Sequence, residues 1–368
     1  MIDDGALLAA VEAATPAGLD VMRFVHANPE LAHEEHRCSA YVADALERAG
    51  LVLERGVGGM ETAFSATLEG ARTGRTVGIV CLYDGVAAVR PDGSIEAVHS
   101  CGHGPIAGAV TMAAAALASL RDQLAGRVRV IGCPADEIHA PETAERGGGK
   151  LLSAAAGLWD DVDAALYAHP EFIDTVSLQS RWLRREHVVV AGARSLNGRP
   201  EPPLQAAAEI VGANALDVMV ERVALDGDVE EGTGLVCRAQ VLVFADALDE
   251  LEQRCAALRR VVSGGEWRSG PTVEGVRPDE AVKRAVAEAM RAAGRDFVAD
   301  PPPLPFATDF GNVSRRAPAA LIGIGRPGGW AFHSDEGAAQ FASADGEAAA
   351  VATAQVLALA AARLTEPA

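Results

Sequence analysis

Short apolar runs alternate with longer apolar stretches of helical period over most of the chain, and this alternation restricts the possible folds more than any other feature. The run 76–84 (TVGIVCLYD) is rich in β-branched residues and ends in an acid, as a buried strand does. Strands are expected at 50–55, 62–70, 76–84, 127–137, 162–170 and 319–325, and helices at 5–27, 35–49, 105–124, 149–157, 278–294 and 343–364. Strands that alternate with buried helices predict an α/β fold with helices on both faces of a sheet.

The pattern changes near residue 175, where strands and helices no longer alternate regularly. Strands are expected at 176–192 and 234–246, helices at 202–223 and 247–262, and a linker rich in glycine and proline at 263–278. We therefore expect a catalytic α/β domain formed by 1–178 and 264–368, interrupted by a small inserted α+β domain at 179–263.

The overall charge argues against some classes of binding partner. A formal net charge of −19 is unfavourable for binding nucleic acid or an anionic membrane surface. The first residues (MIDDGALLAA) carry acids where a signal peptide needs positive charge, and the alanine-rich stretches 108–120 and 351–364 are short for a membrane span. Six cysteines without a CxxC pair indicate free thiols. These features favour a cytoplasmic protein with reduced cysteines that binds neither nucleic acid nor a membrane.

Polar residues of the kinds that bind metals recur where successive strands end. Asp84 follows one strand; His99, Cys101 and His103 precede a buried helix; Asp136, Glu137 and His139 follow another strand; His169 and His333 lie at or beyond two more. A single histidine at a strand end is usually a hydrogen-bonded structural residue. Recurrence at several strand ends instead favours a site for divalent metals, which needs N, O and S ligands from separate elements and a carboxylate to activate water.

Other motifs give weaker indications. The segment GGGK at 147–150 lacks the spacing of a phosphate-binding loop, so Lys150 is expected only to open a helix. Cys101 and His103 could form a nucleophilic pair, but residues two apart seldom face each other.

At these residues the chain resembles the metal-dependent aminoacylases and carboxypeptidase-type metallopeptidases. The resemblance is strongest to the amidohydrolase branch, which contains aminobenzoyl-glutamate hydrolases, indole-acetyl-amino-acid hydrolases and Xaa-Lys/Arg dipeptidases. The matching stretches, in the family's order, are 26–46, YDG at 83–85, HSCGHGPIAGA at 99–109, GCPADE at 132–137, 147–170, 307–325 and 332–346.

The resemblance implies an aminopeptidase-like catalytic domain with a mixed sheet flanked by helices, and an inserted lid that forms a homodimer. It implies that two divalent ions, zinc or manganese, are held by Cys101, His103, Glu137, His169 and His333. Asp136 takes the position of the general base, and Asp84 that of a residue supporting the metals. The implied reaction is attack of a metal-bridging water on the amide bond of a small N-acyl amino acid or dipeptide.

The chain departs from the family pattern at several positions. Gly104 replaces an Asp or Asn, Asp136 is shorter than the usual Glu, and an extra stretch at 138–146 brings His139 close to the site. The inserted domain is shorter than in relatives. The lid histidine of relatives has no counterpart, because no histidine lies between His187 and His333.

Substitutes for that histidine, and further substrate contacts, are expected from polar residues in two segments. Arg194, Asn197 and Arg199 could replace the missing donor. Thr308 and Asn312, in ATDFGNVS, are expected at the substrate end of the cleft, although an ordinary capped turn explains them nearly as well.

Three functions are therefore compared. The first is a metal-dependent amide hydrolase, indicated by the complete ligand set. The second is a relative that uses the same metals for amide formation or cyclisation, suggested by the altered base and lid. The third is a non-catalytic binding protein, which a fold alone does not exclude.

Overall fold

The computed structural model describes residues 1–192, 202–213, 217–228, 233–262 and 264–367. Arg194, Asn197 and Arg199 lie outside the described residues. The chain divides into two compact units. The first comprises Met1–Gln179, Val276–Pro303 and Asp309–Ala368, and the second Ser180–Gly275 and Leu304–Thr308.

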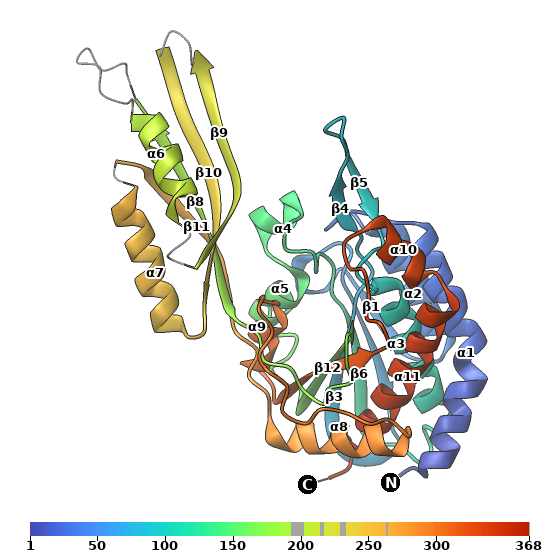
Figure 1. Cartoon of the computed structure of the whole chain (residues 1–368). Coiled ribbons are helices and arrows are strands. Elements are labelled where there is room, and N and C mark those ends of the chain that lie inside the picture. The colour runs from blue at the N-terminus through green and yellow to red at the C-terminus, as the bar shows by residue number, and fades with distance from the viewer. Residues whose placement is uncertain (193–201, 214–216, 229–232, 263, 368) are drawn as a thin grey trace. The chain divides into compact units, whose positions relative to one another are not determined.

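A six-stranded mixed sheet forms the centre of the first unit (Figure 1). Its strands, in spatial order, are β1 (Val52–Arg55), β2 (Phe64–Glu69), β6 (Ala125–Gly132), β3 (Arg72–Cys81), β7 (Ala164–Glu171) and β12 (Ala319–Gly325). The last four run parallel to one another. At the other edge of the sheet, β2 runs antiparallel to both of its neighbours, β6 and β1. The prediction of a mixed α/β sheet flanked by helices is confirmed, and β12 has the bounds expected.

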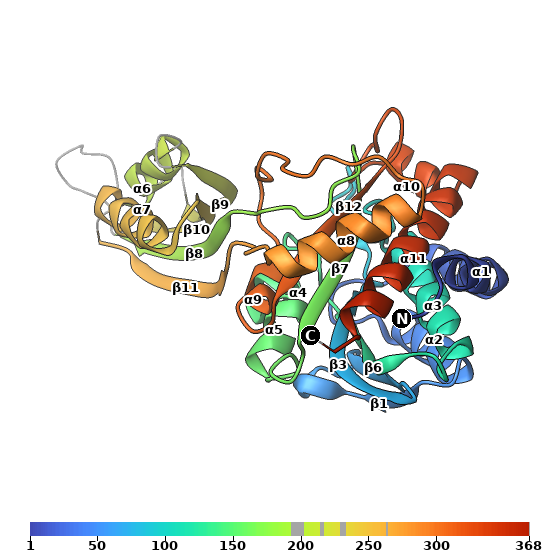
Figure 2. The same cartoon turned by 90° about the horizontal axis from the view of Figure 1, so that it is seen from below.

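Helices lie on both faces of this sheet (Figure 2). On one face, α3 (His103–Ser119) and α11 (Ala344–Leu364) pack against each other, and α1 (Asp4–Ala27) covers both. The remaining helices of the unit are α2 (His36–Arg48), η1 (Val57–Gly59), α4 (Pro141–Arg146), α5 (Gly149–Ala155), α8 (Glu280–Ala292), α9 (Phe310–Ser314) and α10 (Asp335–Phe341). Because α3 is covered by helices as well as by the sheet, nearly all of its residues are buried.

Glycines allow α1 and α3 to approach closely. A Cβ atom at Gly108 would lie 2.7 Å from the carbonyl oxygen of Gly18, and one at Gly18 would lie 2.2 Å from Cγ of Met112. These distances are too short for real contacts, so the two helices pack with their backbones close together.

A two-stranded hairpin precedes α3 and was not expected from the sequence. It consists of β4 (Val86–Val89) and β5 (Ile95–Val98), which pair antiparallel and form a sheet of their own. Pro91, Asp92 and Gly93 form the turn, and Gly93 has a φ of 84°, which glycine adopts without strain.

The second unit is a four-stranded antiparallel sheet in the order β11-β8-β10-β9. Its elements are β8 (Trp182–Ala191), α6 (Pro202–Val211), β9 (Val218–Asp228), β10 (Thr233–Ala245), α7 (Leu248–Val261) and β11 (Glu266–Val273). Residues of both helices, such as Ile210 and Leu258, share one buried cluster with Val188 and Val241 of the sheet. This unit therefore has an apolar core of its own.

Two sequence expectations for this region are wrong. The helix expected over 202–223 ends at Val211. The strand β9 follows, because its valines pack from one side of the strand against the buried cluster of this unit. The linker expected over 263–278 contains β11, so the second unit runs to Gly275 rather than to residue 263. Gly270 and Pro271, which suggested a linker, coincide with a register shift on an edge strand, where such residues are tolerated.

Within the part of the chain that the structure describes, two helices are long and apolar enough to cross a membrane, judged by length and composition alone. The most apolar window has a mean hydropathy of 1.2 in α1 and 1.3 in α11. The stretch 351–364, judged short for a span from the sequence, is part of the longer helix α11 (21 residues). Buried core helices pass the same test, and 67% of the window in α11 is buried.

Candidate metal centre

The carboxyl ends of the parallel strands bring distant polar residues to one edge of the sheet. Asp84 follows β3, Glu137 follows β6, His169 lies near the end of β7, and His333 follows β12. Parallel strands end at the same edge, so residues separated by up to 249 positions (84 to 333) meet there. The prediction that the site forms at strand ends agrees with this placement.

Cys101 lies at the centre of the cluster. Its Sγ is 3.6 Å from Nε2 of His169 and 3.3 Å from Nε2 of His333. The donor atoms of Cys101, His103 and His169 lie within 4.8 Å of one another, and so do those of Cys101, Glu137 and His333. The two groups share the sulfur atom, so two ions could be held side by side with Cys101 as a common ligand.

The chemistry of these donor atoms fits divalent metals. Nε2 of His103 and Oε1 of Glu137 are buried and make no hydrogen bond among the described residues. Burial without a partner is costly for a polar atom, and a cation would relieve that cost. Sulfur, imidazole nitrogen and carboxylate oxygen are the ligand types of zinc sites.

Surrounding groups fix the orientation of the imidazoles of His103, which is buried, and His169, which is partly buried. Nδ1 of His103 lies 2.7 Å from the main-chain oxygen of Asp84, and Nδ1 of His169 lies 2.7 Å from that of Pro170. A carbonyl oxygen only accepts, so Nδ1 carries the proton in each ring and Nε2 is left free to bind a metal. The Asp84 carboxylate also accepts the main-chain N–H of Glu137 at 3.0 Å.

Electrostatics within the cluster favour a thiolate. Burial opposes ionisation of Cys101, but contacts with His103, His169 and His333 outweigh it and hold the pKa of the thiol well below its usual value. Burial, followed by the nearby sulfur, raises the pKa of Glu137 well above its usual value. A cation between these groups would stabilise both charged forms.

The loop that carries Asp136 and Glu137 is held by a residue that the sequence analysis missed. Ala135 has a φ of 56°, a left-handed conformation that is unfavourable for alanine, and its N–H donates to Oε1 of Glu35 at 2.9 Å. Glu35 is fully buried, and burial raises its pKa to about 8. The only sequence signal for it is its place in HEEH, within the stretch that matches the family.

Lys150 makes contacts that the sequence analysis did not predict. It lies in the first turn of α5 and is fully buried. Its Nζ donates to Asp136 and forms an ion pair with Oδ1 of Asp309 at 2.8 Å. The expectation that it only opens a helix is wrong. Its position thirteen residues after Glu137, beside three glycines, was the available signal.

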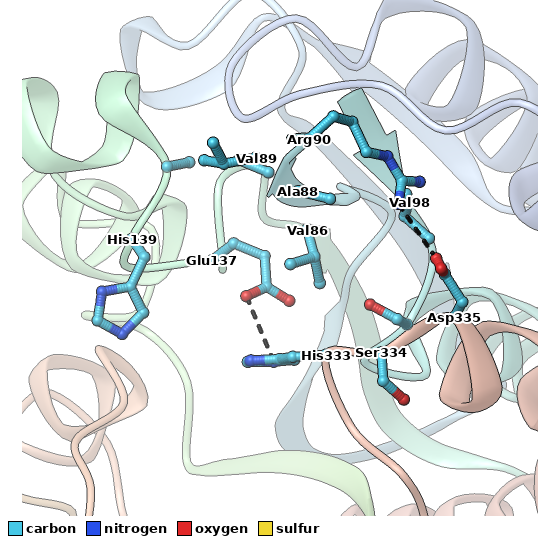
Figure 3. A pocket seen from close by; sticks show the side chains of 13 residues that line it. Val86, Ala88, Val89, Arg90, Val98, Glu137, His139, His333, Ser334 and Asp335 are labelled. Carbon is cyan, nitrogen blue, oxygen red and sulfur yellow. Dashed lines mark hydrogen bonds and ion pairs between the residues drawn. The ribbon is translucent and has the colours of Figure 1, made fainter. Parts of the chain in front are cut away.

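A pocket of about 540 Å³ opens beside Glu137 and His333 (Figure 3). Val86, Ala88 and Val98 of the β4–β5 hairpin give it an apolar wall. Across it, Arg90 pairs with Asp335 at 3.3 Å. The complete lining is Val86, Ala87, Ala88, Val89, Arg90, Val98, Ser100, Glu137, His139, Ala140, His333, Ser334 and Asp335.

The other sequence-predicted site residues are more dispersed. His139 lines the pocket, with its ring apart from the Glu137–His333 pair (Figure 3). Asn312 lies on α9 in the first unit, and Thr308 belongs to the second unit. Gly104 lies in the first turn of α3, where a Cβ atom would be 3.2 Å from the main-chain oxygen of Met22. Its lack of a side chain thus matches close packing against α1.

Solved structures share this fold. The YXEP protein of Bacillus subtilis, described as a dinuclear metal-binding peptidase, superimposes with a TM-score of 0.72 at 21% identity, over 96% of this chain and 99% of that one. An aminobenzoyl-glutamate utilization protein from Klebsiella pneumoniae gives a TM-score of 0.71 at 17% identity, over 96% and 97% of the two chains.

Sequence comparison adds the family. One of the subunits of the p-aminobenzoyl-glutamate hydrolase of Escherichia coli is 31% identical over 44% of this chain, and the match spans only 34% of that relative's length. The N-acetyl-L-cysteine deacetylase of Bacillus subtilis is 24% identical over 86% of this chain and 82% of its own. The family model for peptidase family M20/M25/M40 matches residues 80–363, most of the chain. The chain therefore belongs to peptidase family M20/M25/M40.

Proposed function

We propose that the protein is a metal-dependent hydrolase that cleaves the amide bond of a small N-acyl amino acid or dipeptide. One observation carries the proposal: Cys101 belongs to two groups of metal-type donor atoms at once. The first group, with His103 and His169, and the second, with Glu137 and His333, would each hold one divalent ion. The ions are zinc or manganese, and the sulfur and imidazole donors favour zinc.

Bound at this site, the metals would supply a water of lowered pKa and polarise the amide carbonyl. Asp136 is the proposed general base. Its Oδ2 lies 3.2 Å from Nε2 of His103, so it faces the ligand cluster. It would accept the proton of the attacking water and return it to the leaving amine. Asp84 would hold His103 and the Glu137 main chain in place, as its contacts indicate.

The pocket supports a substrate with an uncharged arm. Val86, Ala88 and Val98 offer apolar contacts, and the guanidinium of Arg90 is already paired with Glu96 and Asp335. His139 at the pocket, Thr308 and Asn312 are proposed as further substrate contacts. Arg194 and Asn197 are proposed in place of the missing lid histidine.

We propose a cytoplasmic homodimer joined through the inserted domain, whose extent we assign to Ser180–Gly275. The relatives include a hydrolase, a deacetylase and a dipeptidase, which favours hydrolysis over a biosynthetic reaction or simple binding.

Metal content is the decisive measurement. Protein purified without chelator should carry two equivalents of zinc or manganese by inductively coupled plasma mass spectrometry, and His103→Ala and His169→Ala should each reduce that number. His36→Ala is the matched control, because His36 is exposed and lies on α2. A wild-type protein without metal would contradict the proposal, as would two bound metals without release of amines from acyl amino acids or dipeptides.

A further inference from the structure

We propose that Lys150 is a positioning residue which, together with Asp309, fixes the carboxylate of Asp136 for proton transfer. The inference rests on the proposed function, in which Asp136 is the general base. It concerns two residues outside the metal-type donor groups, and it assigns a purpose to the glycine-rich segment 147–150.

The burial of these charges is the first observation. The Lys150 side chain is 0% exposed, and those of Asp309 and Asp136 are 2% and 14% exposed. The Lys150 ammonium donates to Oδ1 of Asp136, forms an ion pair with Oδ1 of Asp309 at 2.8 Å, and lies 5.1 Å from the centre of the Tyr167 ring. An ammonium so deeply buried is tolerated only when it is paired, and here one ammonium joins two carboxylates.

Asp309 is itself anchored, so Lys150 has a rigid support. The Oδ2 atom of Asp309 accepts the main-chain N–H of Leu151 at 3.0 Å. A Cβ atom at Gly148 would lie 2.3 Å from that oxygen, so only glycine leaves room for it. Asp309 and the first turn of α5 therefore hold each other in place and give the lysine a rigid support.

The neighbouring glycine brings α5 against the loop that carries Asp136. The N–H of Gly149 donates to the main-chain oxygen of Pro134 at 2.9 Å. A Cβ atom at Gly149 would lie 2.2 Å from the same oxygen. The glycine run thus lets α5 dock directly on this loop and places Lys150 beside Asp136.

The result is a carboxylate with one oxygen held and the other facing the site. Oδ1 of Asp136 is bound by Lys150, while Oδ2 lies 3.2 Å from Nε2 of His103 and 3.5 Å from the Tyr167 hydroxyl. An aspartate is one methylene shorter than a glutamate and reaches about 1.5 Å less far. Since displacements of about 1 Å can cost about 100-fold in rate, its orientation must be well fixed.

The test removes the buried ion pair as a unit. Lys150→Met alone would leave a buried carboxylate without its counterion, so the main variant is Lys150→Met/Asp309→Asn, in which both side chains are neutral and close in size. The asparagine introduced there can still accept from the Leu151 N–H. The surface pair Lys283→Met/Asp300→Asn provides the matched control. Lys150→Arg tests rescue by another cation.

The readouts are kcat and KM on a panel of N-acetyl and N-benzoyl amino acids and dipeptides, together with metal content and thermal stability. We expect kcat of the main variant to fall about 10- to 100-fold with KM within about twofold and both metals retained. Lys150→Arg should recover part of kcat, and the control pair should leave it unchanged. In an Asp136→Asn background, the main variant should cause no further loss, because Lys150 acts through Asp136.

Several results would overturn the proposal. These are an unchanged kcat in a folded, metal-loaded main variant, a loss of metal or of folding that accounts for the lost activity, or an equal fall in the Asp136→Asn background. A wild-type protein that binds two metals but hydrolyses nothing on the panel would overturn the proposed function, and with it this role of Lys150.

Discussion

At the scale of the residue, the sulfur of Cys101 joins two groups of donor atoms, whereas His333 belongs to only one of them. Removing Cys101 should therefore weaken both metal positions, and removing His333 only one. We expect Cys101→Ala to retain less than half of the wild-type metal and His333→Ala to retain about half. Dialysis against a weak chelator followed by metal analysis would measure this difference, and equal retention in the two variants would contradict the shared-sulfur arrangement.

His99 makes a second residue-scale prediction, on acid stability. It is 3% exposed, neither ring nitrogen makes a hydrogen bond among the described residues, and burial lowers its pKa to about 3. The unfolded chain takes up this proton near pH 6.5, but the folded protein does not do so until about pH 3. Burial of His99 therefore does not lower the free energy of unfolding above pH 6.5. As the pH falls from 6.5 toward 3, unfolding takes up a proton at His99, so the free energy of unfolding decreases by at most about 1.4 kcal/mol per pH unit.

Replacing His99 should remove this dependence. In chelator-treated protein, His99→Leu should show a flatter fall of the urea-unfolding free energy between pH 6.5 and 4.5 than the wild type. His36→Leu, at an exposed position, serves as the control and should follow the wild-type curve. Parallel curves for His99→Leu and the wild type would refute the role of its burial.

At the scale of the element, the contact between α1 and α3 depends on two glycines. A methyl group at Gly108 would meet the Gly18 oxygen at 2.7 Å and Cβ of Met22 at 2.9 Å, so the helices would have to separate. We expect Gly108→Ala to destabilise the protein by about 1–3 kcal/mol. Gly5→Ala, in the exposed first turn of α1, should be neutral or slightly stabilising in the same thermal-unfolding measurement.

The elements of the first unit were largely predictable from the sequence, since buried strands and helices have distinct periods, as β12 and α11 illustrate. In the second unit, the valines of β9 fit a helical period as well as a strand period over a short window. Gly270 and Pro271 are typical of a linker, so β11 was not recognised as a strand. The residues of the site were recognisable because they recur at strand ends. The support given by Glu35 to Ala135, and by Asp309 to Lys150, spans 100 and 159 positions, and no local pattern encodes such a contact.

At the scale of the whole molecule, the two units have separate cores, and the proposed metals would bind only the first. A ligand stabilises only the folded part that binds it. We expect calorimetry to resolve two transitions, of which EDTA lowers one and added zinc restores it. A single transition that moves as a whole would show that the units unfold together.

The order of the strands also has a consequence for synthesis on the ribosome. β12 lies at the edge of the first sheet, and His333 follows it, yet both come after the whole of Ser180–Gly275 in the chain. When β11, the last strand of the second unit, has been synthesised, that unit lacks only residues 304–308. The proposed ligand cluster is complete only after residue 333 has been added. A nascent chain therefore carries an almost complete second unit before His333, the last of the proposed ligands, is synthesised, and we expect uptake of the proposed second ion to be a late event of biogenesis.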